Sequence, residues 1–380
     1  MESGGYLFNI NYKLTLKLIK QLDWKLITIV SVIFGFGLII LSSATHANST
    51  GGFTQIYKQV LAFILGAGAL IFILLFDYNV LGKYYKEIYL ISLILLAVVL
   101  IPGIGAVRGG ARSWIHLGPL DLQTSEIVKL TFIISYAKIV ESKKGKLNTI
   151  KEIVPVLLYA LPFIGLLLAQ PDLGGAIVFI CIIAAMLFLS GLSTKLIKRT
   201  IIIIVLISPL LYLAMADHQK VRIEAFLNPE DVTLQGNYQV MQSMIAIGSG
   251  GVTGKGLYNG SQNQENFLPV QDSDFVFAVV GEELGAFGML FVILMFTLFI
   301  IRLLYIAKEA KDFYGSLIVI GVMGMFAYQI IQNIGMTVAL IPVTGVTLPF
   351  ISAGASSVLT SLANLGLVLN VYMRRKKINF

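Results

Sequence analysis

Long apolar runs separated by short polar connections repeat along almost the whole chain. Many of the runs have about 20 residues, the length with which an α-helix crosses a hydrocarbon layer of about 30 Å. The pattern therefore predicts an all-α, polytopic membrane protein with no large soluble domain. Ten transmembrane helices fit the pattern, at residues 24–43, 55–76, 86–105, 123–141, 152–169, 174–192, 200–216, 274–301, 313–340 and 355–373.

Composition supports this prediction, because 57% of the 380 residues are hydrophobic and only 13% are charged. The first apolar run is long and lacks a clear cleavage site, so we interpret it as a retained span and not as a signal peptide. The single cysteine, Cys181, lies in an apolar run and is expected to be a small buried side chain.

The basic residues predict the orientation in the membrane. Of the 28 Lys and Arg residues, 21 fall in the terminal segments and in alternate connections, and six fall in the other connections. Because cytoplasmic connections are enriched in Lys and Arg, both termini should be cytoplasmic. The net charge is +8, but the basic residues are not gathered into one patch with interleaved aromatic residues. A nucleic acid partner is therefore not expected.

This orientation places three unusual connections outside the cytoplasm, at residues 106–122, 217–273 and 341–354. The longest joins the seventh and eighth helices, and a polar connection of that length in a tight bundle is more often functional than connective. We therefore predict a cytoplasmic segment at 1–23, a transmembrane domain at 24–373 and a cytoplasmic tail at 374–380, with function on the outer face.

Two acidic residues inside or beside the predicted spans are candidates for function. Glu126 and Lys129 are three residues apart in a predicted helix, so they can pair within the membrane. The pair could serve a cavity or only fix helix packing, and the sequence favours neither. Asp172, in "LAQPDLGGAI", has a functional interpretation and a structural one, in which it caps the following helix.

The outer segment "RGGARSWIHLG" carries Arg108 and Arg112 among glycines. Guanidinium groups match phosphate oxygens, and glycine lets the backbone approach a ligand, which suits a diphosphate partner. The alternative is that the arginines meet lipid headgroups while Trp114 anchors the chain at the interface. The His and Cys residues are too few for a metal cluster, whereas a divalent cation held by carboxylates and substrate phosphate remains open.

The long connection includes "GNYQVMQSMIAIGSGGVTGKG", whose first half has a helical pattern and whose second half is too glycine-rich for a helix. Gln239, Gln242, Ser243 and Lys255 supply polar groups suited to a sugar or a diphosphate. The alternative is a solvated surface. No strand precedes the glycines, so the segment does not indicate a nucleotide-binding loop.

Asp274 stands where this connection ends and an apolar run begins, and partial burial there would make it a better base. The alternative is an ordinary N-cap supplied by Asp272, Ser273 or Asp274. Glu282 and Glu283 lie roughly 12 Å deeper along the helix, too far to share one reaction with Asp274. We expect them to hold the bundle by pairing, and one testable arrangement has Glu282 or Glu283 facing Lys129.

Six stretches taken together resemble the SEDS family of RodA, FtsW and SpoVE. They occur in the family's order and cover most of residues 24–375. The segments "KLIKQLDWKLI" and "AFLNPEDVTLQGNYQVMQS" are more similar to RodA than to FtsW. The stretches read "RSWIHLGPLDLQTSEIVK", "QPDLGGAIVF", "GNYQVMQSMIAIGSGGVTGKG", "NFLPVQDSDFVFAVVGEELG", "QNIGMTVALIPVTGVTLPFISAGASS" and "NLGLVLNVYMRR".

The resemblance implies a peptidoglycan glycosyltransferase that polymerises lipid II on the outer face of the cytoplasmic membrane, in cell-wall elongation and shape control. It places the essential acid on Asp274. The family's Gln-Pro-Ser-Glu and Lys fall on Gln123, Ser125, Glu126 and Lys129, with Thr124 in place of the Pro. In the motif that begins at Ser352, "SAGASS" replaces Ser-Tyr-Gly-Gly-Ser-Ser, which removes an aromatic hydroxyl and a flexible position.

The expected partners are a class B penicillin-binding protein as transpeptidase, lipid II, undecaprenyl diphosphate and membrane lipids. No tightly bound cofactor is expected, although a divalent cation, Mg²⁺ or Mn²⁺, could assist the leaving diphosphate together with Arg108, Arg112 or Lys255. Two other functions stay open: a lipid II flippase, which the intramembrane charges would suit, and a non-catalytic activator of the penicillin-binding protein.

Overall fold

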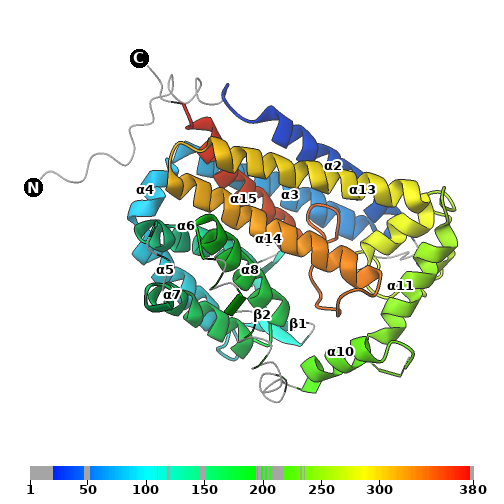
Figure 1. The fold of residues 1–380 in the computed structure, drawn as a ribbon. Helices are drawn as coiled ribbons and strands as arrows, with labels where there is room; N and C mark the ends of the chain where they lie inside the picture. Colours follow the sequence, from blue (N-terminus) through cyan, green and yellow to red (C-terminus); the bar gives the residue numbers. More distant parts are fainter. Residues whose placement is uncertain are drawn as a thin grey trace, which may run out of the picture.

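The computed structural model describes residues 20–376 except 47–51, 109, 118–119, 146, 148–149, 194, 196–197, 200–201, 203–205, 207–211, 213–216, 232 and 235. Figure 1 shows a bundle of long helices with a small sheet and shorter helices at one end. The elements are α2 (Trp24–Ala44), α3 (Gly52–Leu75), α4 (Tyr78–Lys83), α5 (Tyr85–Val98), β1 (Ala106–Arg108), β2 (Ala111–Leu117), β3 (Leu120–Gln123), α6 (Thr124–Ser142), α7 (Ile150–Ala169), α8 (Leu173–Leu189), α10 (Asp217–Leu227), α11 (Asn237–Gly250), α12 (Ser261–Gln264), α13 (Val276–Glu309), α14 (Phe313–Thr337) and α15 (Ala355–Met373).

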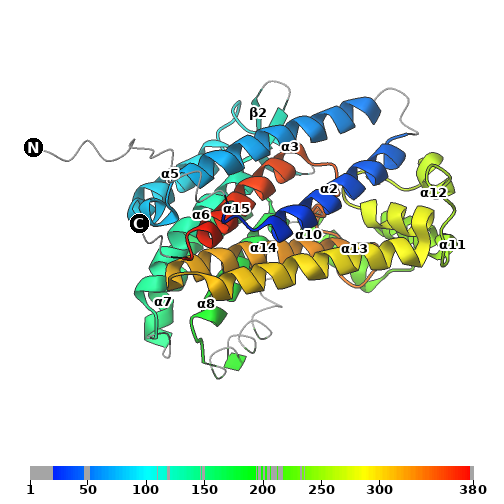
Figure 2. The ribbon, with the colours of Figure 1, turned by 90° about the horizontal axis from the view of Figure 1, so that it is seen from above.

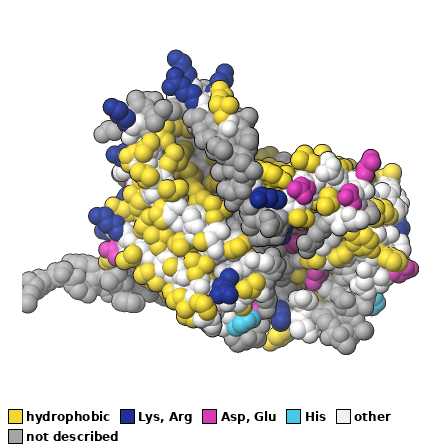
Figure 3. Space-filling model, turned by 90° about the horizontal axis from the view of Figure 1, so that it is seen from below, with side chains coloured by type: hydrophobic (Ala, Val, Ile, Leu, Met, Phe, Trp, Pro, Cys, Tyr) yellow, Lys and Arg dark blue, Asp and Glu magenta, His cyan; other side chains and the backbone are white. Residues whose placement is uncertain are grey.

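Nine of the ten predicted spans coincide with helices, and the tenth, at 200–216, falls largely outside the described residues. Within the described part of the chain, six helices are long and apolar enough to cross a membrane, and α8 is a shorter apolar helix. The polytopic helical class predicted from the sequence is therefore confirmed. Figure 3 shows hydrophobic side chains over the left half of one face, whereas most of the acidic side chains in that view lie on the right.

Helix α15 forms the centre of the bundle, and 94% of its most apolar stretch is buried. Small residues let α3 lie close against it. A Cβ on Gly66 would stand 3.0 Å from the Cα of Leu359, and a Cβ on Gly366 would stand 3.0 Å from the Cα of Leu70. Contacts between glycines and neighbouring backbone are the usual basis of close helix packing in membranes.

The chain ends of the bundle lie on one side. Arg302 near the end of α13 pairs with Asp23 at 2.7 Å, and Arg375 after α15 donates to the carbonyl of Gln21 at 3.3 Å. Figure 2 shows the start of α2 and the end of α15 on the same side of the bundle. This agrees with termini on a common face, while the choice of the cytoplasmic face stays a prediction.

The sequence interpretation missed two features at the end of the bundle that lies away from the start of α2 and the end of α15. Residues 106–123 form a three-stranded antiparallel sheet with the order β1–β2–β3, in which Trp114 pairs with Gln123. The long connection 217–273 contains the helices α10, α11 and α12. The helical pattern seen at "QVMQSMIAI" is confirmed by α11.

Candidate active site

Asp274 lies in a tight turn immediately before α13. The backbone N–H groups of Ser273, Asp274 and Phe275 all donate to the carbonyl oxygen of Val270, at 3.3, 3.1 and 3.3 Å. The N-cap of α13 is Phe275, and no side chain caps the helix. The capping role considered for Asp274 is therefore absent, and its carboxylate is available for other chemistry.

Three donors fix this turn from the other side. The carbonyl oxygens of Asp272, Ser273 and Asp274 accept hydrogen bonds from the Ala353 N–H, the Ser352 hydroxyl and the Asn333 amide, in that order. All three donors belong to α14 or to the segment that follows it. Hydrogen bonds to the backbone thus position Asp274, and its carboxylate is not needed to hold the turn.

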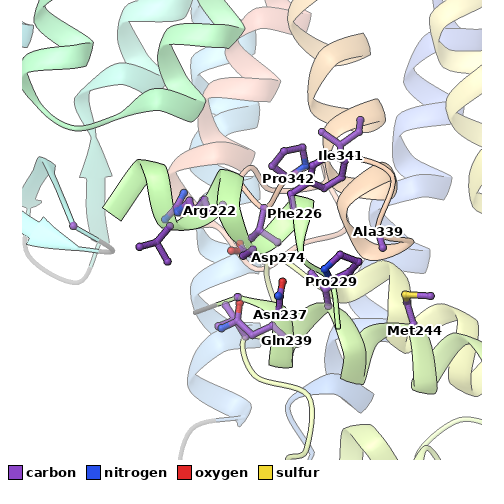
Figure 4. A pocket seen from close by; sticks show the side chains of 18 residues that line it. Arg222, Phe226, Pro229, Asn237, Gln239, Met244, Asp274, Ala339, Ile341 and Pro342 are labelled. Atoms are coloured by element: carbon purple, nitrogen blue, oxygen red, sulfur yellow. The ribbon is translucent and has the colours of Figure 1, made fainter. Parts of the chain in front are cut away.

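A cavity of about 610 Å³, here named the wide cavity, opens beside Asp274. Most of its lining is apolar, with Ala225 and Phe226 of α10 on one side and Ile341 and Pro342 on another. Figure 4 shows Arg222 of α10 beside Asp274, with Gln239 and Asn237 below them, all around one space. A groove with an apolar wall, one acid and one guanidinium suits an amphipathic ligand that carries a phosphate.

A second cavity of about 250 Å³, the inner cavity, lies on another side of Asp274 and shares Asp274 and Gly345 with the wide cavity. It gathers residues from three distant motifs. The residues that line it include Gln123, Ser125, Glu126, Lys129, Asp172, Gln329 and Thr344. The segments "LQTSEIVK", "QPDLGG" and "QDSDF" therefore meet in one place.

Asp172 joins two of these motifs. One carboxylate oxygen accepts from the N–H of Gly175 at 2.8 Å, which caps α8, while the other accepts from Ser125 at 2.9 Å and Gln123 at 3.3 Å. The capping interpretation is confirmed, and the same side chain also connects α8 to the start of α6.

Glu126 and Lys129 form the expected pair, with 2.6 Å between Oε1 and Nζ. Only 3% of the Lys129 side chain and 14% of the Glu126 side chain are exposed. The second carboxylate oxygen of Glu126 accepts from Thr360 of α15 at 3.1 Å. The pair therefore both lines the inner cavity and links α6 to the central helix.

Burial raises the pKa of Asp274 from the ordinary carboxyl value of 3.8 to about 6. A hydrogen bond from Ser273 and the positive charge of Arg222 oppose this shift, while the charge of Asp272 adds to it. A carboxylate with a pKa near 6 is a stronger base than an ordinary aspartate and is still ionised at neutral pH.

Comparison with known proteins identifies the family. A family model described as "Cell cycle protein", which covers FtsW, RodA and SpoVE, matches residues 23–377. The chain belongs to the SEDS family.

Among its relatives, FtsW of Bacillus subtilis, named a probable peptidoglycan glycosyltransferase, is 35% identical over 94% of this chain and 92% of its own. Stage V sporulation protein E of the same organism is 35% identical over 92% and 96%. The peptidoglycan glycosyltransferase MrdB of Escherichia coli K12 is 36% identical over 77% and 78%. These identities are nearly equal, so the closer similarity to RodA stays a prediction.

Solved SEDS structures have the same fold. A chain from a peptidoglycan synthase complex, studied for how polymerization and crosslinking are coordinated, superposes with a TM-score of 0.81, at 30% identity over 93% of this chain and 98% of its own. The rod shape determining protein RodA of Thermus thermophilus superposes with a TM-score of 0.69, at 30% identity over 94% and 98%.

In this SEDS protein, Glu282 and Glu283 have partners other than the one expected. Glu282 pairs with Lys255 at 2.7 Å, and Glu283 accepts from Ser43 at 2.6 Å and Asn263 at 2.9 Å. The expectation that one of them faces Lys129 is wrong, because Lys129 pairs with Glu126. Their role in holding the bundle together is supported, since both are fully buried.

The glycine-rich segment 250–256 packs against a break in α13. Gly285 interrupts α13 with a φ of 64°. The N–H groups of Lys255 and Gly256 donate to the carbonyls of Glu282 and Glu283, and the carbonyls of Gly251 and Val252 accept from the N–H groups of residues 286 and 287. The segment 250–256 therefore supplies the hydrogen bonds that the broken helix lacks, and its glycines serve this close approach.

Several predicted binding residues lie away from both cavities. Lys255 is held in its pair with Glu282, and Ser243 is fully buried and donates to the carbonyl of Thr337. Arg112 and Gln242 line neither cavity. Arg108 belongs to β1, but its side chain lies outside what the structure describes. Among the outer-loop residues Arg108, Arg112, Gln239, Gln242, Ser243 and Lys255, the structure brings Gln239 to Asp274.

The sequence interpretation overlooked Arg222 and Asn333. Arg222 has only the sequence signature of an outer charge, because its position in α10 beside Asp274 cannot be read from local sequence. Asn333 is a fully buried amide within the apolar helix α14. A polar residue inside a membrane span is itself a signal, and that signal could have pointed to Asn333.

Proposed function

We propose that this SEDS protein is a peptidoglycan glycosyltransferase that polymerises lipid II on the outer face of the bacterial cytoplasmic membrane, with Asp274 as general base. The observation that carries the proposal is the position of Asp274 between an apolar cavity with Arg222 and an inner cavity with three family motifs. The names of its relatives support the reaction class.

Asp274 takes the proton from the 4-hydroxyl of the acceptor N-acetylglucosamine. That oxygen forms a bond to the anomeric carbon of the donor N-acetylmuramic acid and inverts it, while the bond from this carbon to the diphosphate oxygen breaks. Undecaprenyl diphosphate leaves with the electron pair. Because diphosphate is a good leaving group, one carboxylate suffices, in contrast to the paired carboxylates of glycosidases.

Arg222 supplies positive charge where the diphosphate leaves. It lines the wide cavity together with Asp274, and its charge acts on that carboxyl group. A fixed guanidinium stabilises developing phosphate charge and can bind two phosphate oxygens at once. In this proposal Arg222 takes the role for which the sequence offered Arg108, Arg112 or Lys255, since Lys255 is paired with Glu282 and Arg112 lines neither cavity.

The described residues do not offer a resident divalent cation a site made of protein ligands alone. The described residues contain no group of three His, Cys, Asp or Glu side chains that could hold a metal. Of the other carboxylates that line the inner cavity, Glu126 is paired with Lys129, and Asp172 accepts hydrogen bonds from Ser125 and Gly175. The charge of Arg222 acts on Asp274 itself and would repel a cation there. No step of the mechanism is routed through a metal.

A class B penicillin-binding protein is the proposed partner. Support comes from the similarity to a chain of a peptidoglycan synthase complex in which polymerization and crosslinking are coordinated. Such a partner would use the strands made at Asp274 as substrate for crosslinking.

The test is lipid II polymerisation by the full chain, alone and with a co-purified class B penicillin-binding protein. Asp274→Asn should lower the rate by at least ~100-fold, as expected for loss of a general base. Asp231→Asn is the matched control, because Asp231 lies exposed in the same outer connection. Full activity of Asp274→Asn would refute the base assignment. Lipid translocation by the wild type without polymerisation would favour a flippase.

A further inference from the structure

A third cavity of about 290 Å³, here named the side cavity, lies against the turn that carries Asp274. Asp272 and Ser273 line it, but Asp274 does not. Gln55, Lys58 and Gln59 of α3 and Asp121 of β3 complete most of its polar wall. The turn therefore presents one aspartate to the side cavity and the other to the wide and inner cavities.

The side cavity is connected to the site of reaction. It shares Trp114, Ser273, Ala353, Gly354 and Ser356 with the inner cavity, and the inner cavity shares Asp274 and Gly345 with the wide cavity. The three cavities therefore follow one another as wide, inner and side. Asp274 lies at the junction between the apolar first cavity and the two more polar ones.

The chemistry of the side cavity favours an uncharged ligand rich in hydroxyl and amide groups. Lys58 and Gln55 can donate, Asp121 and Asp272 can accept, and Trp114 adds an aromatic surface. Asp272 and Asp121, the latter paired with His116, stand against the single ammonium of Lys58, so the wall has no surplus of positive charge for a diphosphate. The volume lies near the lower end of the range for small-ligand sites.

The wall is also held in a fixed shape. Gln59 is 2% exposed, donates to the carbonyl of Ser352 at 2.8 Å and accepts from the N–H of Gly354 at 3.1 Å. Both partners belong to the segment that also fixes the turn of Asp274. A cavity whose walls are positioned by buried hydrogen bonds loses little order when a ligand binds.

We propose that the side cavity is a subsite for the glycan strand, which holds an amino sugar beyond the pair of sugars that react at Asp274. The inference rests on the proposed function. A polymerase must hold a growing glycan strand, whereas a transferase that adds a single sugar to each acceptor has no strand to hold. Gln55, Lys58, Asp121 and Asp272 bind the hydroxyl and acetamido groups, and Trp114 contacts the sugar at the passage to the inner cavity.

The two tryptophans of the chain permit a direct test. Trp24 is the first residue of α2 and is 60% exposed, so its replacement should be tolerated. Trp24→Phe leaves Trp114 as the only indole of the chain. Full-length Trp24→Phe protein is titrated with the neutral N-acetylglucosamine tetramer while Trp114 fluorescence is recorded. We expect a saturable change, and an affinity about tenfold weaker after Lys58→Ala or Gln55→Ala, as for one lost hydrogen-bonding group. Lys308→Ala, exposed at the end of α13, is the control and should bind as the parent does.

No saturable change in the parent would overturn the proposal. So would unchanged affinity in both Lys58→Ala and Gln55→Ala, provided that their Tm matches the parent's. Saturation by the free stem pentapeptide without any response to the tetramer would show a peptide site instead, and would also overturn it.

A second measurement separates this inference from the proposed function. Asp274→Asn in the Trp24→Phe background should lose polymerisation and still bind the tetramer with parental affinity. In polymerisation assays, Lys58→Ala should yield shorter strands than Lys308→Ala at equal consumption of lipid II. If Asp274→Asn polymerises normally, the base assignment fails, while the fluorescence titration still decides on the subsite.

Discussion

The side-chain amide of Asn333 donates one hydrogen bond to the carbonyl oxygen of Asp274 at 3.0 Å and another to that of Val346 at 2.9 Å. Asn333 is fully buried in α14. One side chain therefore joins the turn of the proposed base to the segment that forms the opposite wall of the inner cavity. Asn333 is a positioning residue, since its contact is with the backbone of Asp274 and not with its carboxylate.

Asn333→Ala should lower kcat by about 10- to 100-fold with little change in KM, because a shift of the base by less than 1 Å affects the reaction more than binding. It should also lower stability by about 1–3 kcal/mol, since two buried carbonyls lose their donor. Asn364→Ala is the control: Asn364 is equally buried but donates within its own helix, to the carbonyl of Thr360. Equal kcat losses in both variants would argue against a positioning role. Steady-state kinetics and thermal unfolding measure the two effects.

The pKa of Asp274 predicts the pH dependence of the reaction. The base acts when ionised, so kcat/KM should be half-maximal near pH 6, fall below it and level off above it. Arg222→Ala removes a positive charge that lowers this pKa, so the midpoint should move to higher pH. A pH profile of each protein with lipid II checks the direction. A midpoint that is the same in both would show that Arg222 does not act on the base.

The same pKa predicts that Asp274 lowers stability at neutral pH. Its folded-state pKa, about 6, lies above the ordinary value of 3.8, so its stabilising contribution is complete below about pH 3.8 and is lost as the pH rises through 6. At about pH 8 the ionised carboxylate costs folding free energy, and Asp274→Asn should raise Tm. The difference between the two proteins should disappear near pH 4, which thermal unfolding at both pH values can verify.

The close approach of the segment 250–256 to the break in α13 predicts which glycines the fold requires. Gly254 has a φ of 79°, and a Cβ there would stand 2.1 Å from the carbonyl oxygen of Glu283. Gly254→Ala should therefore cost at least ~2 kcal/mol. Gly248→Ala in α11 should instead add up to about 1 kcal/mol, because a Cβ on Gly248 meets nothing within 4 Å and alanine favours helix. If thermal unfolding gave similar Tm values for both variants, the close approach would not matter.

The sequence predicted the parts of this molecule that depend on local pattern. Apolar runs of about 20 residues specify membrane helices whatever surrounds them, and the three-residue spacing of Glu126 and Lys129 was enough to predict their pair. The resemblance to the SEDS family pointed to Asp274 before any geometry was known. Each of these inferences needs only a short stretch of chain.

The remaining parts depend on which segments meet in space. Glu282 pairs with Lys255 because α13 breaks at Gly285 and the glycine-rich segment fills the break. A regular helix, which the apolar pattern predicts, would have given Glu282 different neighbours. Arg222 reaches Asp274 only because α10 folds over the wide cavity. Contacts between residues about 50 positions apart leave no periodic signal in a single sequence.

The buried pair of Glu126 and Lys129 predicts an asymmetry between single and double variants. Lys129→Met leaves the Glu126 carboxylate without its partner at 2.6 Å and should cost about 3–5 kcal/mol. The double variant Glu126→Gln with Lys129→Met removes both charges, and should recover most of that loss because neither side chain is then a buried ion. Activity separates a structural from a functional role, since both residues line the inner cavity. If the double variant regains stability but not polymerisation, the charges act on the substrate; recovery of both would mean that the pair only holds α6 in place. Thermal unfolding and lipid II polymerisation, measured on the same three proteins, distinguish these outcomes.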